Sequence, residues 1–171
     1  YPGPGVGGHC IPVDSVYYSF WARASGWPAE FAEHARRVNA QMPFYVATLI
    51  RDALQSKGKT IQGSKVLMLG VTYKKDIEDV RESPILELIH HLRGEGAIIN
   101  FHDPAVTSIG VEKSVINRLE LTEDVIKDQD CVVFAVAHSS YHLAWLYGVS
   151  PLIVDLTNGF AEFPPDKIIS L

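Results

Sequence analysis

The stretch KVLMLGV, Lys65–Val71, is the part of the sequence that decides the fold. It is a short, uninterrupted apolar run with polar residues before it and a charged segment after it. Such a run is typical of a strand that is covered on both faces, as in a parallel sheet. The sequence therefore predicts a buried parallel strand near the middle of the chain.

The segments that follow this run alternate between helical and extended patterns. SPILELIHHLRGEG predicts a helix with Ser83 as its N-cap and Pro84 at N1, ending at Gly94 or Gly96. Further elements are predicted as strands at 97–103, 130–137 and 152–156, a short helix at 121–128, and a turn or short helix at 140–147. Strands and helices that alternate with short connections are typical of a parallel α/β sheet with right-handed crossovers.

The residues before the run have a helical pattern instead. From Ala29 to about Leu54, apolar residues recur at steps of three and four, which predicts one face of an amphipathic helix. Pro43 lies inside this pattern, so we expect a kink or a break into two helices. A shorter helix is expected to begin with Ser15 as its cap and to end at Gly26.

The chain divides at a linker, SKGKTIQGS, Ser56–Ser64. We expect residues 1–62 to form a helical piece and residues 63–171 to form an α/β domain. The predicted fold class is thus α/β, a Rossmann-like parallel-sheet domain preceded by a helical segment. Ligands of open α/β sheets collect beyond the carboxyl ends of the strands. The candidate sites are therefore residues 70–81, 102–104, 138–142 and 155–159, of which 70–81 is the most unusual.

The composition of the 171 residues argues against several classes of partner. The formal net charge is −5 and there is no Lys/Arg block, so no nucleic-acid partner is expected. No run approaches the roughly 20 apolar residues that span a bilayer, so no membrane partner is expected. The two cysteines make neither a disulfide framework nor a metal spacing, and the seven histidines are scattered. We therefore expect no metal site, and the cytoplasm as compartment.

The opening stretch GPGVGGHCIPVD, Gly3–Asp14, crowds glycines and prolines around Cys10. A dinucleotide fingerprint is disfavoured, because it requires a strand before the glycines. The stretch reads either as a loop that brings its backbone and an accessible thiol to a ligand, or as a turn with a buried, inert cysteine. His9 is expected to be structural, because neighbouring side chains usually diverge. Cys131, among Val and Phe, is expected in the core.

A second unusual stretch, VTYKKDIEDVRESP, Val71–Pro84, follows the central strand directly. Its charged side chains come just before a helix N-terminus. Lys74 and Arg81, helped by that helix end, could hold phosphates. The alternative is a solvated charged loop.

Both stretches, together with ARRVNAQMP, Ala35–Pro43, closely resemble the UDP-glucose/GDP-mannose dehydrogenase family. These enzymes oxidise the C6 alcohol of a nucleotide sugar to a carboxylate with two NAD. GHC followed by IPVD is more similar to the branch acting on UDP-N-acetylmannosamine or UDP-N-acetylglucosamine than to the UDP-glucose branch, which tends to read GSC and FPKD. The resemblance implies a UDP-N-acetylhexosamine substrate, first of all UDP-N-acetyl-D-mannosamine, with NAD as cofactor and a homodimer formed through the helical piece.

The resemblance also implies roles for single residues. Cys10 is the implied nucleophile, which captures the aldehyde as a thiohemiacetal and later carries a thioester. Asp14 is implied to position or activate the hydrolytic water. The remaining implied contacts are Gly7, Tyr73 and Lys74 with the substrate, and Arg81 with the NAD.

Two positions depart from the family. Thr157 stands where a basic residue is common after the last strand, and Ser15 stands where Pro often follows the acidic residue. The 171 residues do not include the family's Rossmann domain with its NAD fingerprint, so the resemblance implies a C-terminal fragment that is expected to be inactive alone. The alternatives are a UDP-glucose 6-dehydrogenase and a non-catalytic nucleotide-binding module. A cysteine hydrolase ranks last, because no histidine lies in a recognisable motif.

Overall fold

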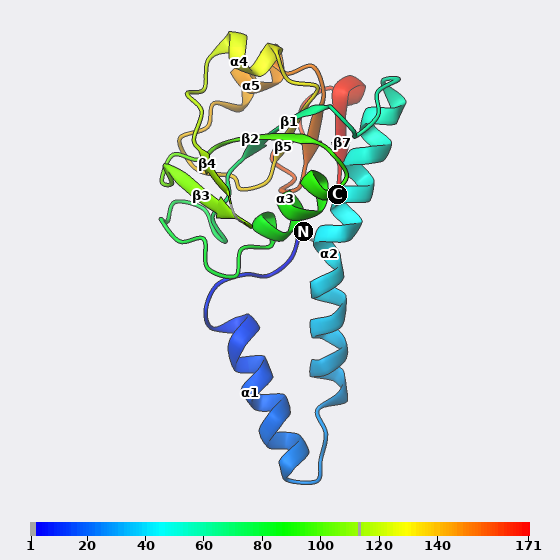
Figure 1. Ribbon diagram of the computed structural model, residues 1–171, viewed down its shortest axis with the longest axis vertical. Helices are drawn as coiled ribbons and strands as arrows, with labels where there is room; N and C mark the ends of the chain where they lie inside the picture. The colour runs from blue at the N-terminus through cyan, green and yellow to red at the C-terminus, as the bar shows by residue number, and fades with distance from the viewer. Residues whose placement is uncertain (1–2, 113) are drawn as a thin grey trace.

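The computed structural model describes residues 3–112 and 114–171, and a five-stranded sheet lies at its centre (Figure 1). The strands of this sheet are β1 (Lys65–Leu69), β2 (Ile98–His102), β5 (Cys131–Phe134), β6 (Ile153–Asp155) and β7 (Ile168–Ser170). Their order is β2-β1-β5-β6-β7, and every neighbouring pair is parallel. The predicted α/β class with a parallel sheet is confirmed.

Helices cover both faces of the sheet and give the body three layers. The helices of one face are α2 (Glu30–Ser56) and α3 (Pro84–Gly94). Those of the other face are α4 (Glu123–Lys127) and α5 (Leu143–Val149). The central strand β1 has both of its faces buried for this reason, as its apolar run predicts.

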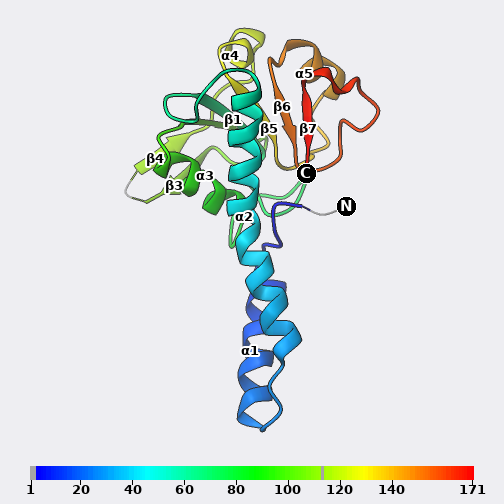
Figure 2. The same cartoon turned by 90° about the vertical axis from the view of Figure 1, so that its right-hand side faces the viewer.

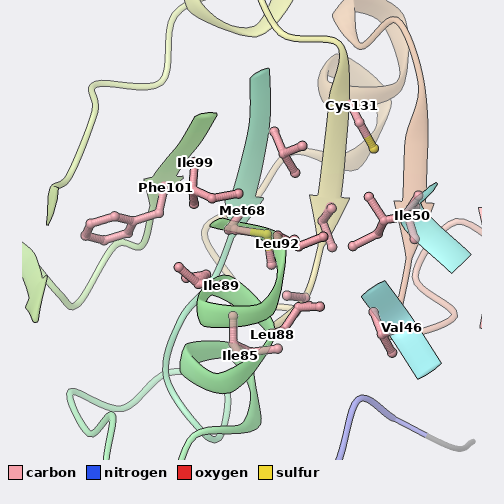
Figure 3. Close-up of a cluster of buried hydrophobic side chains, with 14 of the residues drawn as sticks. Val46, Ile50, Met68, Ile85, Leu88, Ile89, Leu92, Ile99, Phe101 and Cys131 are labelled. Atoms are coloured by element: carbon pink, nitrogen blue, oxygen red, sulfur yellow. The ribbon is translucent and has the colours of Figure 1, made fainter. Parts of the chain in front are cut away.

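Side chains of β1 alternate between the two layers. Met68 is fully buried toward α2 and α3, whereas Leu67 and Leu69 are fully buried toward α4 and α5. Figure 3 shows Met68 beside Leu92 of α3, with Ile50 of α2 in the same cluster. Each such side chain contributes about 1.5–3 kcal/mol through its removal from water.

Helix α3 begins as the sequence predicts. The Ser83 hydroxyl accepts a hydrogen bond from the backbone N–H of Ile85 at 3.3 Å, and Pro84 occupies the first turn. Ile85, Leu88, Ile89 and Leu92 are the buried residues of this helix. Their spacing of three and four places one face of the helix on the sheet.

Helix α1 (Ile11–Ala24) begins earlier than the sequence predicts, and α2 continues unbroken through Pro43. Cys10 rather than Ser15 is the N-cap of α1, so the expected Ser15 cap is wrong. The Ser15 hydroxyl instead donates to the carbonyl of Pro12 inside the first turn, at 3.0 Å. Helix α2 is one helix through Pro43, not two.

Helix α1 and the N-terminal half of α2 project from the body as an antiparallel pair, which we call the stem (residues 11–42; Figures 1 and 2). The other half of α2 packs on the body, where Val46, Ala47 and Ile50 are fully buried. Helix α2 therefore belongs to both parts. The domain boundary between residues 62 and 63 stays a prediction.

Three strands, β3 (Ser108–Val111), β4 (Ser114–Asn117) and β7, were not expected from the sequence. Strands β3 and β4 pair antiparallel beside the main sheet. At the far edge, a 3-10 turn at Pro165–Lys167 leads into β7, the last strand. None of the helices that the structure describes is both long and apolar enough to cross a bilayer.

Candidate active site

A cavity of about 250 Å³ lies at the carboxyl end of the parallel sheet. Strand β1 lies between β2 and β5. The connection after β1 leads to one side of the sheet, toward β2, and the connection after β5 leads to the other side, toward β6, so the two connections diverge. This is the switch point at which α/β sheets bind ligands. The cavity is lined from three strand ends and from the glycine-rich segment by residues that include Thr72, Tyr73, Lys74, Lys75, Val136, Thr157 and Gly5.

The segment after β1, Val71–Ser83, which we call the charged loop, folds back on itself. The backbone N–H of Tyr73 donates to the carbonyl of Asp79 at 3.1 Å. The Arg81 guanidinium donates to both carboxylate oxygens of Asp79, the shortest contact being 2.7 Å. These bonds lower the pKa of Asp79 to about 2. Arg81 is thus held in a fixed direction, with its side chain exposed.

The glycine-rich segment, Gly3–Cys10, which we call the Cys10 loop, docks directly on the charged loop. The N–H of Gly8 donates to the carbonyl of Arg81 at 3.2 Å. A Cβ atom on Gly7 would lie 2.5 Å from the carbonyl oxygen of Glu82 and 2.8 Å from Cβ of Tyr73. Only glycine permits this approach, so the packing of the two loops by itself explains Gly7.

Asn39 of α2 fixes the other end of the Cys10 loop. Its side-chain oxygen accepts from the N–H of Val6 at 2.8 Å, and its side-chain nitrogen donates to the carbonyl of Val6 at 3.3 Å. Asn39 belongs to ARRVNAQMP, the third stretch that carries the family resemblance. The three stretches of the sequence therefore meet in space.

Cys10 is exposed at the N-terminus of α1, a helix of 14 residues. Its Sγ lies 3.1 Å from Nδ1 of His9, so these neighbouring side chains meet and do not diverge as expected. Asp14 follows one helical turn later, and its N–H donates to the carbonyl of Cys10 at 2.7 Å. The free N–H groups of a helix start attract negatively charged groups.

Cys131 differs from Cys10 in its exposure to solvent. It is fully buried in β5, and burial raises the pKa of its thiol to about 12. The prediction that it is a core residue is confirmed, and of the two cysteines only Cys10 has an exposed thiol.

The structure brings the candidate residues together in two groups. Tyr73 and Lys74 line the cavity beside residues of the Cys10 loop. Cys10 and Asp14 lie at the start of α1. The carbonyl of Arg81 accepts a hydrogen bond from Gly8 of the Cys10 loop, which leads into this helix.

Thr157 lines the cavity as well, in the connection after β6. Its hydroxyl donates to the buried carboxylate of Asp155 at 3.0 Å, and its N–H donates to the same oxygen at 2.9 Å. The hydroxyl also accepts from the N–H of Gly159 at 3.2 Å. Thr157 thereby shapes its own loop.

A buried pair beneath the cavity joins two of the predicted strand ends, 102–104 and 138–142, but the pairing itself was not predicted. Nε2 of His138 lies 3.0 Å from Oδ2 of Asp103, and both side chains are fully buried. The signal that was available is position, because His138 follows β5 and Asp103 follows β2 directly. Parallel strands bring such ends to one edge of the sheet.

A larger groove, about 1070 Å³, separates the stem from α3 and the β3–β4 hairpin. Its walls include apolar side chains from both helices of the stem, among them Ile11 and Phe31. In residues 3–112 and 114–171, no three His, Cys, Asp or Glu side chains gather to hold a metal ion.

Comparison with known proteins identifies the family. The UDP-binding domain of the UDP-glucose/GDP-mannose dehydrogenase family matches residues 67–162, and its central domain matches residues 1–41. The chain is 36% identical over 140 residues to UDP-N-acetyl-D-mannosamine dehydrogenase of Methanococcus vannielii, covering 82% of this chain and 30% of the relative. It is 31% identical over 136 residues to UDP-N-acetyl-D-glucosamine 6-dehydrogenase of Salmonella typhi, covering 80% of this chain and 32% of the relative.

A solved structure of a related dehydrogenase matches the chain over its whole length. The NDP-N-acetyl-D-galactosaminuronic acid dehydrogenase of Methanosarcina mazei superposes with a TM-score of 0.81 at 30% identity, over 100% of this chain and 38% of that protein. The chain thus spans about a third of the length of these relatives. The matched domains, the sheet order and the meeting of the three stretches place this chain in the UDP-glucose/GDP-mannose dehydrogenase family.

Proposed function

We propose that this chain is the part of an NAD-dependent nucleotide-sugar 6-dehydrogenase that holds the sugar nucleotide and the reacting cysteine. The observation that carries the proposal is the docking of the Cys10 loop on the charged loop, through the Gly8–Arg81 hydrogen bond and the Gly7–Tyr73 contact. This docking joins an exposed thiol to a cavity lined by Lys74.

Each part of the chain has a place in this proposal. Residues 63–171 would bind the UDP moiety, with Lys74 as a cation for phosphate and Tyr73 beside it. Residues 1–62 would carry the catalytic loop and the central helices. Gly7 would contact the substrate through its backbone, in addition to allowing the two loops to pack.

Cys10 would perform the covalent chemistry. Its sulfur adds to the aldehyde carbon to give a thiohemiacetal, so that the aldehyde does not escape between the two oxidations. After the second oxidation the same sulfur carries the acyl group as a thioester. Asp14 would position the water that hydrolyses this thioester.

NAD would supply the hydride acceptor for both oxidations. The exposed guanidinium of Arg81, which Asp79 holds near the Cys10 loop, would attract this anionic dinucleotide. Arg81 would orient the cofactor toward Cys10. The rest of the NAD site would come from outside these residues, so the chain alone would be inactive.

The substrate is proposed to be a UDP-N-acetylhexosamine, with UDP-N-acetyl-D-mannosamine ranked first. The substrates named for the relatives above support an N-acetylated sugar. UDP-glucose is the alternative substrate, and steady-state assays of the full-length protein against a panel of UDP-sugars separate the two. We place the enzyme in the cytoplasm, since its two cysteines are free.

The catalytic proposal is tested by Cys10→Ala in the full-length protein. NADH production should fall about 10³-fold or more, because no other group of this chain replaces a covalent nucleophile. Cys131→Ala is the matched control and should retain activity. Unchanged NADH production in Cys10→Ala would overturn the covalent role proposed for Cys10.

The binding proposal is tested by calorimetry with UDP. Lys74→Ala should weaken binding about tenfold, the loss of one charge-assisted contact. Lys127→Ala, remote on α4 and paired with Glu123, is the control. Equal UDP affinity in the parent and Lys74→Ala would place the nucleotide elsewhere.

The stem supports a further part of the proposal, a homodimer. Trp27 and Phe31 are 82% and 86% exposed, and Tyr17, Phe20 and Trp21 of α1 are each more than 60% exposed. Apolar aromatic surface of this extent marks an interaction site. We propose that the stem of one chain pairs with that of a second copy.

A further inference from the structure

His138 is a buried titratable side chain to which the proposed reaction gives no role. It follows β5, its imidazole has no exposed surface, and it faces the equally buried carboxylate of Asp103 after β2. Both side chains contact Thr72–Asp76, the segment of the charged loop that carries Tyr73 and Lys74.

The hydrogen bonds of the ring fix its tautomer. The backbone N–H of Asp76 donates to Nδ1 at 3.0 Å, so Nδ1 carries no proton. The proton is therefore on Nε2, which donates to Oδ2 of Asp103 at 3.0 Å and lies 3.2 Å from the Thr72 hydroxyl. The imidazole thus links the loop on one side to the end of β2 on the other.

Asp103 anchors this link to the sheet. Its Oδ2 also accepts from the N–H of Val71 at 2.8 Å, and its Oδ1 accepts from the N–H of Ala105 at 2.9 Å. Burial by itself raises the pKa of Asp103, but the bonds from His138, Val71 and Ala105 outweigh it and lower the pKa to about 2. The carboxylate is charged and fully bonded at neutral pH.

Asp76 is the position where the loop needs support. Its backbone lies in the left-handed region, at φ +60°, which costs about 1 kcal/mol for a residue other than glycine. Ser139, the neighbour of His138, binds the Asp76 carboxylate through its N–H at 2.8 Å and its hydroxyl at 2.6 Å. Two successive residues after β5 therefore hold both the backbone and the side chain of Asp76.

The same hydrogen-bond network includes Lys74, which lines the cavity. The Thr72 hydroxyl donates to the carbonyl of Lys74 at 2.9 Å, which closes the segment into a tight turn between its two anchors. We propose that His138 is a positioning residue for nucleotide binding, which holds Thr72–Asp76 so that Lys74 faces the cavity. This inference rests on the UDP site proposed above.

Two substitutions of His138 distinguish the hydrogen bond at Nδ1 from the hydrogen bond at Nε2. In His138→Asn, the amide oxygen can stand near Nδ1 and still accept from Asp76. In His138→Gln, the amide nitrogen can stand near Nε2 and still donate to Asp103, but the acceptor for Asp76 is lost. Each variant loses one buried bond, so both should lose comparable stability.

The experiment measures UDP affinity by calorimetry and backbone amide exchange of residues 72–76 in the full-length protein. His138→Gln should weaken UDP binding about tenfold and speed exchange in this segment, whereas His138→Asn should stay within about twofold of the parent. His142→Gln, on the exposed histidine that precedes α5, is the control and should change neither quantity.

The outcomes separate this inference from the proposed function. Equal UDP affinity in the two His138 variants, as a purely structural role predicts from their similar stability, would overturn it. A parent that does not bind UDP overturns the proposed function and the inference together. If His138→Gln does not fold, Ser139→Ala removes one bond to Asp76 at the surface, and UDP affinity within error of the parent would then count against the inference.

Discussion

The two halves of α2 share one apolar periodicity but meet different surroundings. In the C-terminal half, Val46 and Ile50 are fully buried against α3 and the sheet. In the N-terminal half, Phe31 is 86% exposed and Val38 is 47% exposed. Periodicity therefore predicts that a helix has an apolar face, but it does not say whether the partner of that face lies in the same chain.

The comparison also separates two sources of stability. The half of α2 on the body is held by its own chain, including a forked ion pair in which Arg51 donates to Glu95 of the α3 end. The stem is held to the body by α2 and by the Cys10 loop, and its aromatic side chains contribute little until something covers them. Three experiments test this difference.

The largest effect is expected from truncation in the buried half. Ile50→Ala should lower the free energy of unfolding by about 2–5 kcal/mol, because it removes fully buried methyl groups and leaves a cavity. Phe31→Ser should change it by less than about 0.5 kcal/mol. Denaturant unfolding at low protein concentration, where pairing is dissociated, measures both, and equal effects would refute the comparison.

A smaller effect is expected from acid, and it should fall on the body alone. The folded pKa of Asp103 is about 2, below its ordinary value of 3.8, so its carboxylate stabilises the fold fully above about pH 4. This contribution, about 2 kcal/mol, should be lost as the pH falls from 4 toward 2.

The measurement is the stability difference between the parent and Asp103→Asn at pH 7 and near pH 2.5. The difference should be largest at pH 7 and should shrink in acid. Glu33→Gln, which breaks the exposed Arg23–Glu33 pair of the stem, should cost less than about 0.5 kcal/mol at either pH. A difference for Asp103→Asn that stays constant with pH would contradict the prediction.

The smallest effect is expected on self-association. Phe31→Ser should weaken pairing of two chains about tenfold, about 1.4 kcal/mol, as for an aromatic side chain at an interface. Sedimentation of the full-length protein measures it. Val115→Ser, which truncates an apolar side chain 69% exposed on the hairpin of the body, is the matched control. Equal weakening by both would show that the stem is not the pairing surface.

Much of the fold could be predicted because its signals are local. The apolar run of β1, the Ser83 cap and the Pro84 start each depend on residues next to one another in the sequence. The start of α1 was misplaced because proline is tolerated in the first turn, so Pro12 does not delay the helix. The β3–β4 pair was missed because its four-residue strands are too short for alternation to stand out.

The candidate site could be predicted only in part. The motifs placed Cys10 and Lys74 correctly in exposed loops, yet the sequence could not show that the Cys10 loop rests on Tyr73. The His138–Asp103 pair depends on two strand ends that are 35 residues apart and become neighbours only through the sheet order. Such contacts arise from topology, which local patterns do not encode.

The exposed aromatic stem also determines what intrinsic fluorescence can report. Of the three tryptophans, Trp21 and Trp27 lie on the stem at 66% and 82% exposure, and Trp145 lies on α5 at 37%. No tryptophan contributes to the buried clusters around the sheet. Emission from this protein should therefore shift to shorter wavelength when the stem becomes covered, and should be a poor monitor of the core as it melts.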